Sequence, residues 1–120
     1  MQPVEVNAGA WYLRALRHDE RLSDVPALTL LGVDDPADYV RRAHEGWTDE
    51  TGYLWAVCIP TTGELVAVIG VTVRGPAGGD LRGLARDGYA EALEQACAPV
   101  SRLAADLLRL DPTPLTVGLP

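Results

Sequence analysis

The strongest structural signal in this chain lies in residues 53–73, which read Tyr53-Leu-Trp-Ala-Val-Cys-Ile59, then Pro60-Thr-Thr-Gly-Glu64, then Leu65-Val-Ala-Val-Ile-Gly-Val-Thr-Val73. The two outer segments are apolar and rich in β-branched and aromatic residues, which is typical of strands covered on both faces. The short connection contains a proline and a glycine. The two segments are therefore predicted to pair as an antiparallel hairpin, with strands near 53–59 and 65–73.

Further elements are predicted on the N-terminal side of this hairpin. The alternation in Trp11-Tyr-Leu-Arg-Ala-Leu16 indicates a short strand over 11–16. Residues 17–33 are predicted to form one or two short helices, because Pro26 interrupts the helical pattern. Asp35 can cap a following helix that has Pro36 at its first position. The apolar face of that helix is formed by residues at spacings of three and four, namely Tyr39, Val40, Ala43 and Trp47.

On the C-terminal side, apolar residues keep a helical spacing from Leu81 to Leu110. This pattern predicts a long C-terminal helical segment over 81–110, bent or divided at Pro99. Residues 114–119 can form a last short strand at a sheet edge, because prolines flank them. The sequence thus predicts an α+β fold in which helices pack on an antiparallel hairpin sheet, with residues 1–120 forming one domain.

Charge and composition restrict the classes of partner. The chain of 120 residues has a formal net charge of −7, which disfavours nucleic-acid binding because that depends on neutralising phosphates. No run of eighteen apolar residues is present, so we expect no membrane partner. The N-terminal residues lack the basic start and the apolar core of a signal peptide, and we therefore expect a cytoplasmic protein.

No residue pattern of a metal site is found. His18 and His44 stand alone in their segments, and Cys58 and Cys97 are too far apart in sequence for a CxxC motif. Both cysteines are predicted to be buried free thiols. Trp47, Tyr53 and Trp55 can line an apolar cleft between the second helix and the hairpin, although packing in the core is the more economical interpretation.

The order of strand, broken helix, capped helix and apolar hairpin resembles the first half of a GNAT-superfamily N-acetyltransferase, of the ribosomal-protein-alanine type. The stretches that carry this resemblance lie within residues 11–73, just over half of the chain: Tyr12-Leu-Arg-Ala-Leu16, Asp35-Pro36 through Trp47, Tyr53-Leu-Trp-Ala-Val57, Thr62-Gly-Glu-Leu-Val66 and Ile69-Gly70. The resemblance implies a GNAT-like fold and transfer of an acetyl group from acetyl-CoA to an amine. None of these stretches is a catalytic signature, so the catalytic residues stay unknown.

The part of the family pattern that holds the cofactor is degenerate in this sequence. Members of the superfamily have a turn of the form Gln/Arg-x-x-Gly-x-Gly/Ala that opens a helix, where bare backbone N–H groups surround the CoA pyrophosphate. Arg82-Gly-Leu-Ala85 has the arginine and one glycine of this turn, and Pro99-Val-Ser-Arg102-Leu-Ala104 has the arginine but neither glycine. By this resemblance Arg82, Gly83 and Arg102 are the candidate cofactor-binding residues.

Three hypotheses for function stay open at this point. The first is a GNAT-like N-acetyltransferase that acts on an aminoacyl N-terminus or a small amine. The second is a non-catalytic binding or assembly module with the same ancestry, which acts through a protein partner, and the acidic surface would favour a basic one. The third is one half of an active site that a homodimer completes, or a piece of a longer enzyme.

Overall fold

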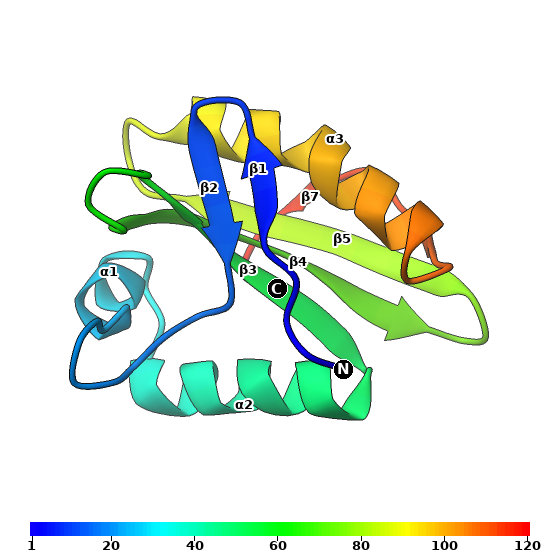
Figure 1. Ribbon diagram of the computed structural model, residues 1–120, viewed down its shortest axis with the longest axis horizontal. Coiled ribbons are helices and arrows are strands. Elements are labelled where there is room, and N and C mark those ends of the chain that lie inside the picture. The colour runs from blue at the N-terminus through cyan, green and yellow to red at the C-terminus, as the bar shows by residue number, and fades with distance from the viewer.

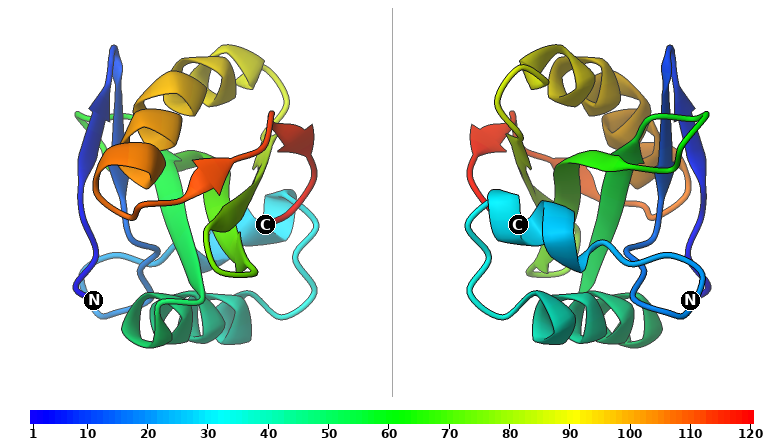
Figure 2. Two further views of the ribbon diagram at one scale, coloured as in Figure 1. Left: turned by 90° about the vertical axis from the view of Figure 1, so that its right-hand side faces the viewer. Right: turned by 90° about the vertical axis from the view of Figure 1, so that its left-hand side faces the viewer.

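The computed structural model describes all residues from 1 to 120, arranged as a sheet between two layers of helices (Figures 1 and 2). One helix, α3, covers one face of the sheet, and α1 and α2 lie on the other side. The sheet has seven strands in the order β1-β2-β3-β4-β5-β6, and β7 also pairs with β5. The elements are β1 Val6–Ala8, β2 Trp11–Arg14, α1 Val25–Leu30, α2 Pro36–Asp49, β3 Gly52–Cys58, β4 Leu65–Arg74, β5 Gly78–Ala85, α3 Ala90–Asp106, β6 Asp111–Pro112 and β7 Thr116–Val117.

The predicted hairpin forms the centre of the sheet as β3 and β4. The two strands pair antiparallel from Gly52 opposite Thr72 to Cys58 opposite Leu65, with one register shift at Val57 and Cys58. Every residue from Tyr53 to Cys58 and from Leu65 to Val71 is buried, because helices cover both faces of this part of the sheet. The prediction for 53–59 and 65–73 is confirmed to within a residue at each end.

The elements before the hairpin largely follow the sequence signals. The strand predicted over 11–16 is β2, which ends at Arg14, and it pairs antiparallel with β3 and with a strand that we did not predict, β1. In α2, the Asp35 side chain accepts a hydrogen bond from the backbone N–H of Asp38, and Pro36 takes the first helical position. The break expected at Pro26 is instead the start of α1, where a proline costs no helical hydrogen bond.

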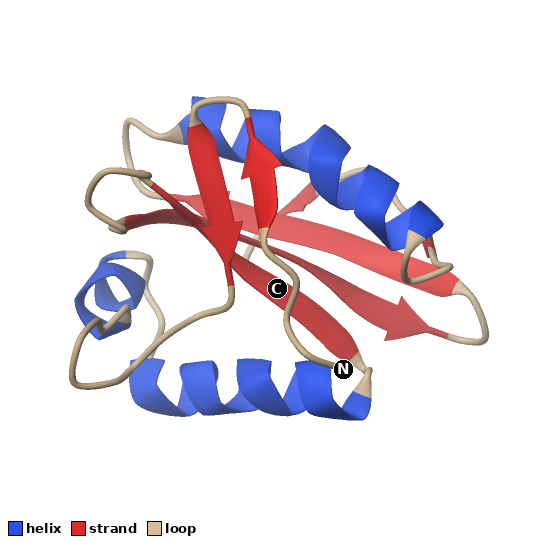
Figure 3. Ribbon diagram, in the orientation of Figure 1, coloured by secondary structure: helices blue, strands red, loops and turns tan.

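The prediction of a long helical segment over 81–110 is wrong in its first part and at its end. Residues 78–85 form β5, which pairs antiparallel with residues 67–74 of β4 (Figure 3). Helix begins only at Ala90 and ends at Asp106. The burial of β5 alternates residue by residue up to Gly83, as in a strand with one covered face, but Leu81 and Ala85 are also four residues apart and so fit a helical spacing. Pairing with β4 satisfies backbone groups along a glycine-rich segment that has low helix propensity.

The C-terminal residues make the sheet mixed rather than purely antiparallel. Both β6 and β7 run parallel to β5, with Asp111 opposite Gly78 and Val117 opposite Gly83. The strand expected over 114–119 is present only as the two residues of β7. A parallel neighbour could not be inferred from the local pattern, since the connection that makes it parallel is the whole of α3.

Two apolar clusters lie on either side of β3 and β4. The cluster that contains the buried residues of α3 also includes Trp47, Tyr53 and Trp55, whose rings meet edge to face. The other cluster joins α1 and α2 to the opposite face of the sheet. Arg14 and Asp24 form a buried ion pair at 2.8 Å that fixes the start of α1 against β2.

Candidate functional site

The sheet opens at the C-terminal end of β5. The tail stays hydrogen-bonded to β5 as far as Gly118, whose N–H donates to the carbonyl of Gly83 at 2.8 Å. From there β5 continues through Leu84 and Ala85 with no partner on that side, and leads into a turn and α3. One side of β5 therefore offers backbone groups to a ligand at the point where α3 begins.

The turn between β5 and α3 leaves several backbone donors free. The N–H groups of Asp87, Gly88, Ala90 and Glu91 have no hydrogen-bond partner in the chain, and Tyr89 at the N-cap makes no side-chain capping bond. Gly88 has φ +86°, and no atom lies within 4 Å of the position that a Cβ would take. Free amides at the positive end of a helix dipole favour anions, and the missing Cβ lets a phosphate approach the backbone.

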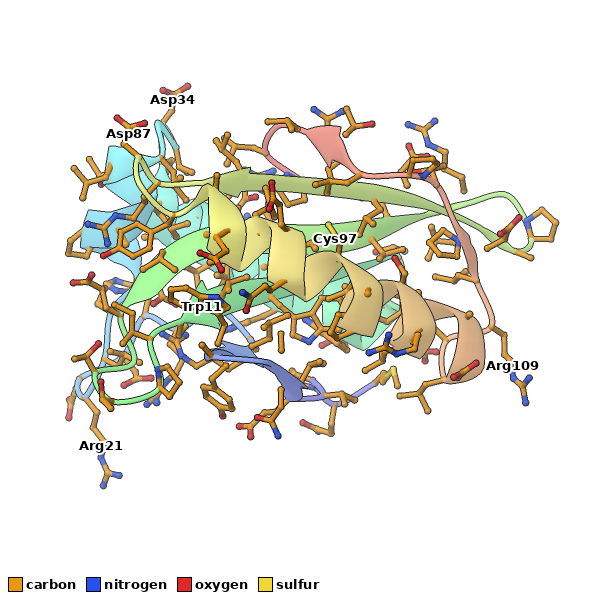
Figure 4. All side chains as sticks on the ribbon, turned by 90° about the horizontal axis from the view of Figure 1, so that it is seen from above. Trp11, Arg21, Asp34, Asp87, Cys97 and Arg109 are labelled. Carbon is orange, nitrogen blue, oxygen red and sulfur yellow. The ribbon has the colours of Figure 1, made fainter.

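Charged side chains at this turn have opposing effects on an anion. Arg86 is the nearest cation, but it is already bonded to Glu64 and to the carbonyl of Leu65, and its guanidinium lies over the ring of Tyr89. Asp87 is exposed and adds a negative charge to the turn. Figure 4 shows Asp34 at the same end of the molecule. The site can attract an anion through the backbone, while its carboxylates oppose binding.

A pocket of about 380 Å³ lies beside this turn. One wall is the end of α1, with Leu30 and Leu31, and the other wall is residues 84–87. Leu30 is 69% exposed, so its side chain is available for contact with a ligand in this pocket. The pocket thus combines an apolar wall with the free amides of the turn.

A second pocket, of about 300 Å³, lies between α2 and the β3–β4 hairpin. Its polar lining includes Tyr39, Arg42 and the hydroxyl-bearing Thr51 and Thr72. Burial raises the pKa of Tyr39 to about 12, so its hydroxyl is a hydrogen-bond donor at neutral pH. No carboxylate side chain and no histidine lines this pocket.

The cleft suggested by Trp47, Tyr53 and Trp55 exists, but only Tyr53 lines it. Trp47 and Trp55 are at most 1% exposed, and each ring N–H donates to a backbone carbonyl, of Leu54 and Val4 respectively. For the two tryptophans, packing in the core is therefore the correct interpretation.

The three candidate cofactor residues lie in different places. Arg82 and Gly83 are neighbours in β5, where the Arg82 Nε donates to the carbonyl of Leu119 and a Cβ on Gly83 would collide with Leu93 of α3. Arg102 is exposed on α3, twelve residues after Ala90, which is about 18 Å along a helix. The structure thus brings Arg82 and Gly83 close to the opening beside β5 and puts Arg102 far along the helix.

The residues that form the turn were missed, although a sequence signal for them exists. Ala85-Arg-Asp-Gly-Tyr-Ala90 contains the Gly-x-Ala half of the family turn, with alanine where the family has glutamine or arginine. The signal was overlooked because the segment was interpreted as helix interior, where a glycine has no such role. The position of Gly88 between β5 and α3 is the one that the family pattern requires.

Other classes of site find little support in the structure. No group of three or more His, Cys, Asp or Glu side chains is arranged to hold a metal ion. None of the three helices combines the length and the apolar character needed to cross a membrane.

Comparison with solved structures identifies the fold. The chain aligns over 98% of its length with 75% of a candidate ribosomal-protein-serine acetyltransferase from Vibrio cholerae, at a TM-score of 0.77 and 17% sequence identity. It also aligns over 98% of its length with 72% of a candidate acetyltransferase from Sphaerobacter thermophilus, at a TM-score of 0.62 and 18% identity. No family model and no curated protein matches the sequence. The chain therefore has the GNAT-like fold expected from its first half, and this likeness extends through α3.

Proposed function

We propose that this chain is a GNAT-like N-acetyltransferase domain that takes an acetyl group from acetyl-CoA and transfers it to an amine. One observation carries the proposal. The unpaired end of β5 leads directly into a turn with an open glycine and a helix whose first amides are free. This is the arrangement that the resemblance requires for a CoA pyrophosphate, and the fold of the two acetyltransferase structures supports it.

The chemical groups of acetyl-CoA match those at the turn between β5 and α3. The amides of Asp87, Gly88, Ala90 and Glu91 would hold phosphate oxygens, and Leu30 and Leu31 would cover apolar parts of the same molecule. The bound cofactor would supply an activated acetyl thioester. Because Asp87 repels the phosphates and no lysine occurs in the chain, we expect a dissociation constant nearer to millimolar than to micromolar.

The amine would enter the pocket between α2 and the hairpin. Since no side-chain carboxylate or histidine lines that pocket and Tyr39 is protonated at neutral pH, no side chain is available there as a general base. The amine must then arrive in its neutral form. We expect the rate of transfer to rise with pH through the pKa of the amine itself.

Calorimetric titration with acetyl-CoA and with CoA, up to millimolar concentrations, tests the cofactor site. The informative variant is Gly88→Ala, which puts a methyl group into the open space beside the turn and strains a residue at φ +86°. Gly75→Ala is the matched control, because Gly75 also has a positive φ and open space around it but lies in the turn at the far end of β5. We expect a heat of binding from the unmodified protein (the parent) and from Gly75→Ala, and no heat of binding from Gly88→Ala. Equal heat from all three proteins would contradict a site at Gly88.

A non-catalytic module is the second candidate, and the free edge of the sheet favours it. Val117 in β7 is 70% exposed at that edge, where another protein or a second copy of the chain could add a strand. Absence of heat from a folded parent protein would favour this function. Affinity capture with the parent and with Val117→Lys as bait would then identify the partner, which should bind the parent alone.

A further inference from the structure

The last three residues of the chain run across the α2 side of the sheet between the two pockets. Figure 2 shows the chain descending from β7 towards α1 and α2. Pro120 lines the pocket between α2 and the hairpin. Leu84, the residue after Gly83, to which Gly118 is hydrogen-bonded, lines the pocket beside α3. Leu84 and Leu119 both pack against the cluster formed by α1 and α2.

Each of these three residues is held by a separate contact. The Gly118 N–H donates to Gly83, the Arg82 Nε donates to the Leu119 carbonyl at 3.2 Å, and the Tyr39 hydroxyl donates to the Pro120 carbonyl at 3.0 Å. The sheet also has room for the segment. A Cβ at Gly70 of β4 would lie 3.1 Å from Pro120, so the glycine lets Pro120 lie close to the strand.

These contacts are few, and water can reach the residues that make them. All three residues are partly exposed, and the net contribution of each such hydrogen bond to stability is about 1 kcal/mol. The contacts to Arg82 and Tyr39 use only the backbone carbonyls of the segment. A ligand that offers carbonyl oxygens to Arg82 and Tyr39 could therefore replace the segment without leaving either donor unpaired.

We propose that residues 118–120 form a strap across the sheet that separates the pocket at α2 from the pocket at α3, and that the strap must move before a donor and an amine can meet. The inference rests on the proposed function, because acetyl transfer requires the two substrates in one continuous space. In the closed form the strap keeps the pocket at α3 separate from the pocket at α2, so the chain inhibits itself.

A thiol-reactivity experiment tests the strap without any substrate. Leu54→Cys puts a thiol in the pocket next to Gly70 and Pro120, and it is combined in the full chain with Tyr39→Phe and Leu119→Ala, which remove two anchors of the strap. Reaction with a disulfide reagent is followed by peptide mapping. The native Cys97, half-buried on α3, is the internal reference, and Cys58 is fully buried.

We expect the rate at the introduced thiol, divided by the rate at Cys97, to rise at least tenfold when the two anchors are removed. An unchanged ratio would overturn the strap. General loosening of the fold would also make the fully buried Cys58 react, so a faster reaction at the introduced thiol while Cys58 stays unreactive assigns the effect to the strap. Ala43→Cys, on α2 in the same pocket, serves as the reporter if Leu54→Cys does not fold.

Hydrogen exchange in the presence of acetyl-CoA then separates the strap from the proposed function. If acetyl-CoA and an amine bind together only after the strap moves, exchange of the Gly118 amide should accelerate at saturation with both. Binding of both with unchanged protection at Gly118 would overturn the need for movement. No binding at all would sink the proposed function, while the thiol ratio would still decide whether the strap covers the pocket.

Discussion

At the scale of single residues, the buried pair of Arg14 and Asp24 decides where α1 starts. Asp24 accepts two hydrogen bonds from Arg14 and one from the Arg17 amide, and both side chains of the pair are at most 7% exposed. Asp24→Asn leaves the arginine buried without a counter-charge. We expect a loss of about 3–5 kcal/mol in the free energy of unfolding, measured by urea denaturation. Asp19→Asn, in an exposed pair with Arg17, is the control and should cause little change.

Asp87 is the residue that most directly opposes the proposed cofactor. Its carboxylate lies in the turn whose amides would hold phosphate, and Asp87→Asn removes that charge without changing the shape of the side chain. We expect CoA to bind about three- to tenfold more tightly, equivalent to about 1 kcal/mol. Asp106→Asn makes the same change at the other end of α3 and should leave affinity unchanged. Equal gains in both variants would mean that only net charge matters.

Burial of Cys58 should make the protein less stable at alkaline pH. Burial raises the pKa of the Cys58 thiol to about 12, well above its ordinary value. Because the pKa is higher in the folded protein than in the unfolded chain, the protonated thiol favours the folded state. This stabilisation is complete below the unfolded pKa of about 8.5 and is lost as the pH rises towards 12. Between pH 9 and 11 the free energy of unfolding of the unmodified protein should fall by up to about 1.4 kcal/mol per pH unit more than that of Cys58→Ala. Parallel curves for the two proteins in urea denaturation would contradict this.

At the scale of elements, α3 contains a proline in its interior. The helix continues from Ala90 to Asp106 through Pro99, which cannot donate to the carbonyl of Gln95 one turn earlier. Pro99→Ala restores that hydrogen bond, and we expect a gain of about 1–3 kcal/mol in the free energy of unfolding by urea denaturation. Pro36→Ala, at the first position of α2, is the matched control and should give no gain. A loss of stability in Pro99→Ala would show that the proline is needed for packing.

At the scale of the whole molecule, the two apolar clusters share β3 and β4 and should unfold together. The radius of gyration is 13.0 Å, close to the value of about 13.6 Å expected for a single domain of this length. We expect one thermal transition that coincides in tryptophan fluorescence, which reports on the α3 side, and in far-UV circular dichroism. Separate transitions would show that the cluster of α1 and α2 is an independent unit.

How much the sequence could predict depends on whether a signal is local. Asp35-Pro36 and the apolar face that follows it specify α2 within one helix, and the alternation and turn residues of 53–73 specify a hairpin of adjacent strands. The candidate cofactor site was only partly predictable. The resemblance pointed to Arg82 and Gly83, which were predicted within a helix and lie in β5. Gly88 was not singled out, because the residues around it also have a helical spacing.

The sequence by itself determined the central hairpin and the capped helix, because caps, turns and period-two runs act over a few residues. The GNAT-like fold was expected from the resemblance of residues 11–73 to that family. Only the tertiary structure decided that 78–85 are a strand, that the tail runs parallel to it, and that Gly118 to Pro120 lie between two pockets. The physical reason is that β5, β6 and β7 hold few apolar side chains and are stabilised by backbone hydrogen bonds to distant strands. Those bonds do not exist until the chain has folded.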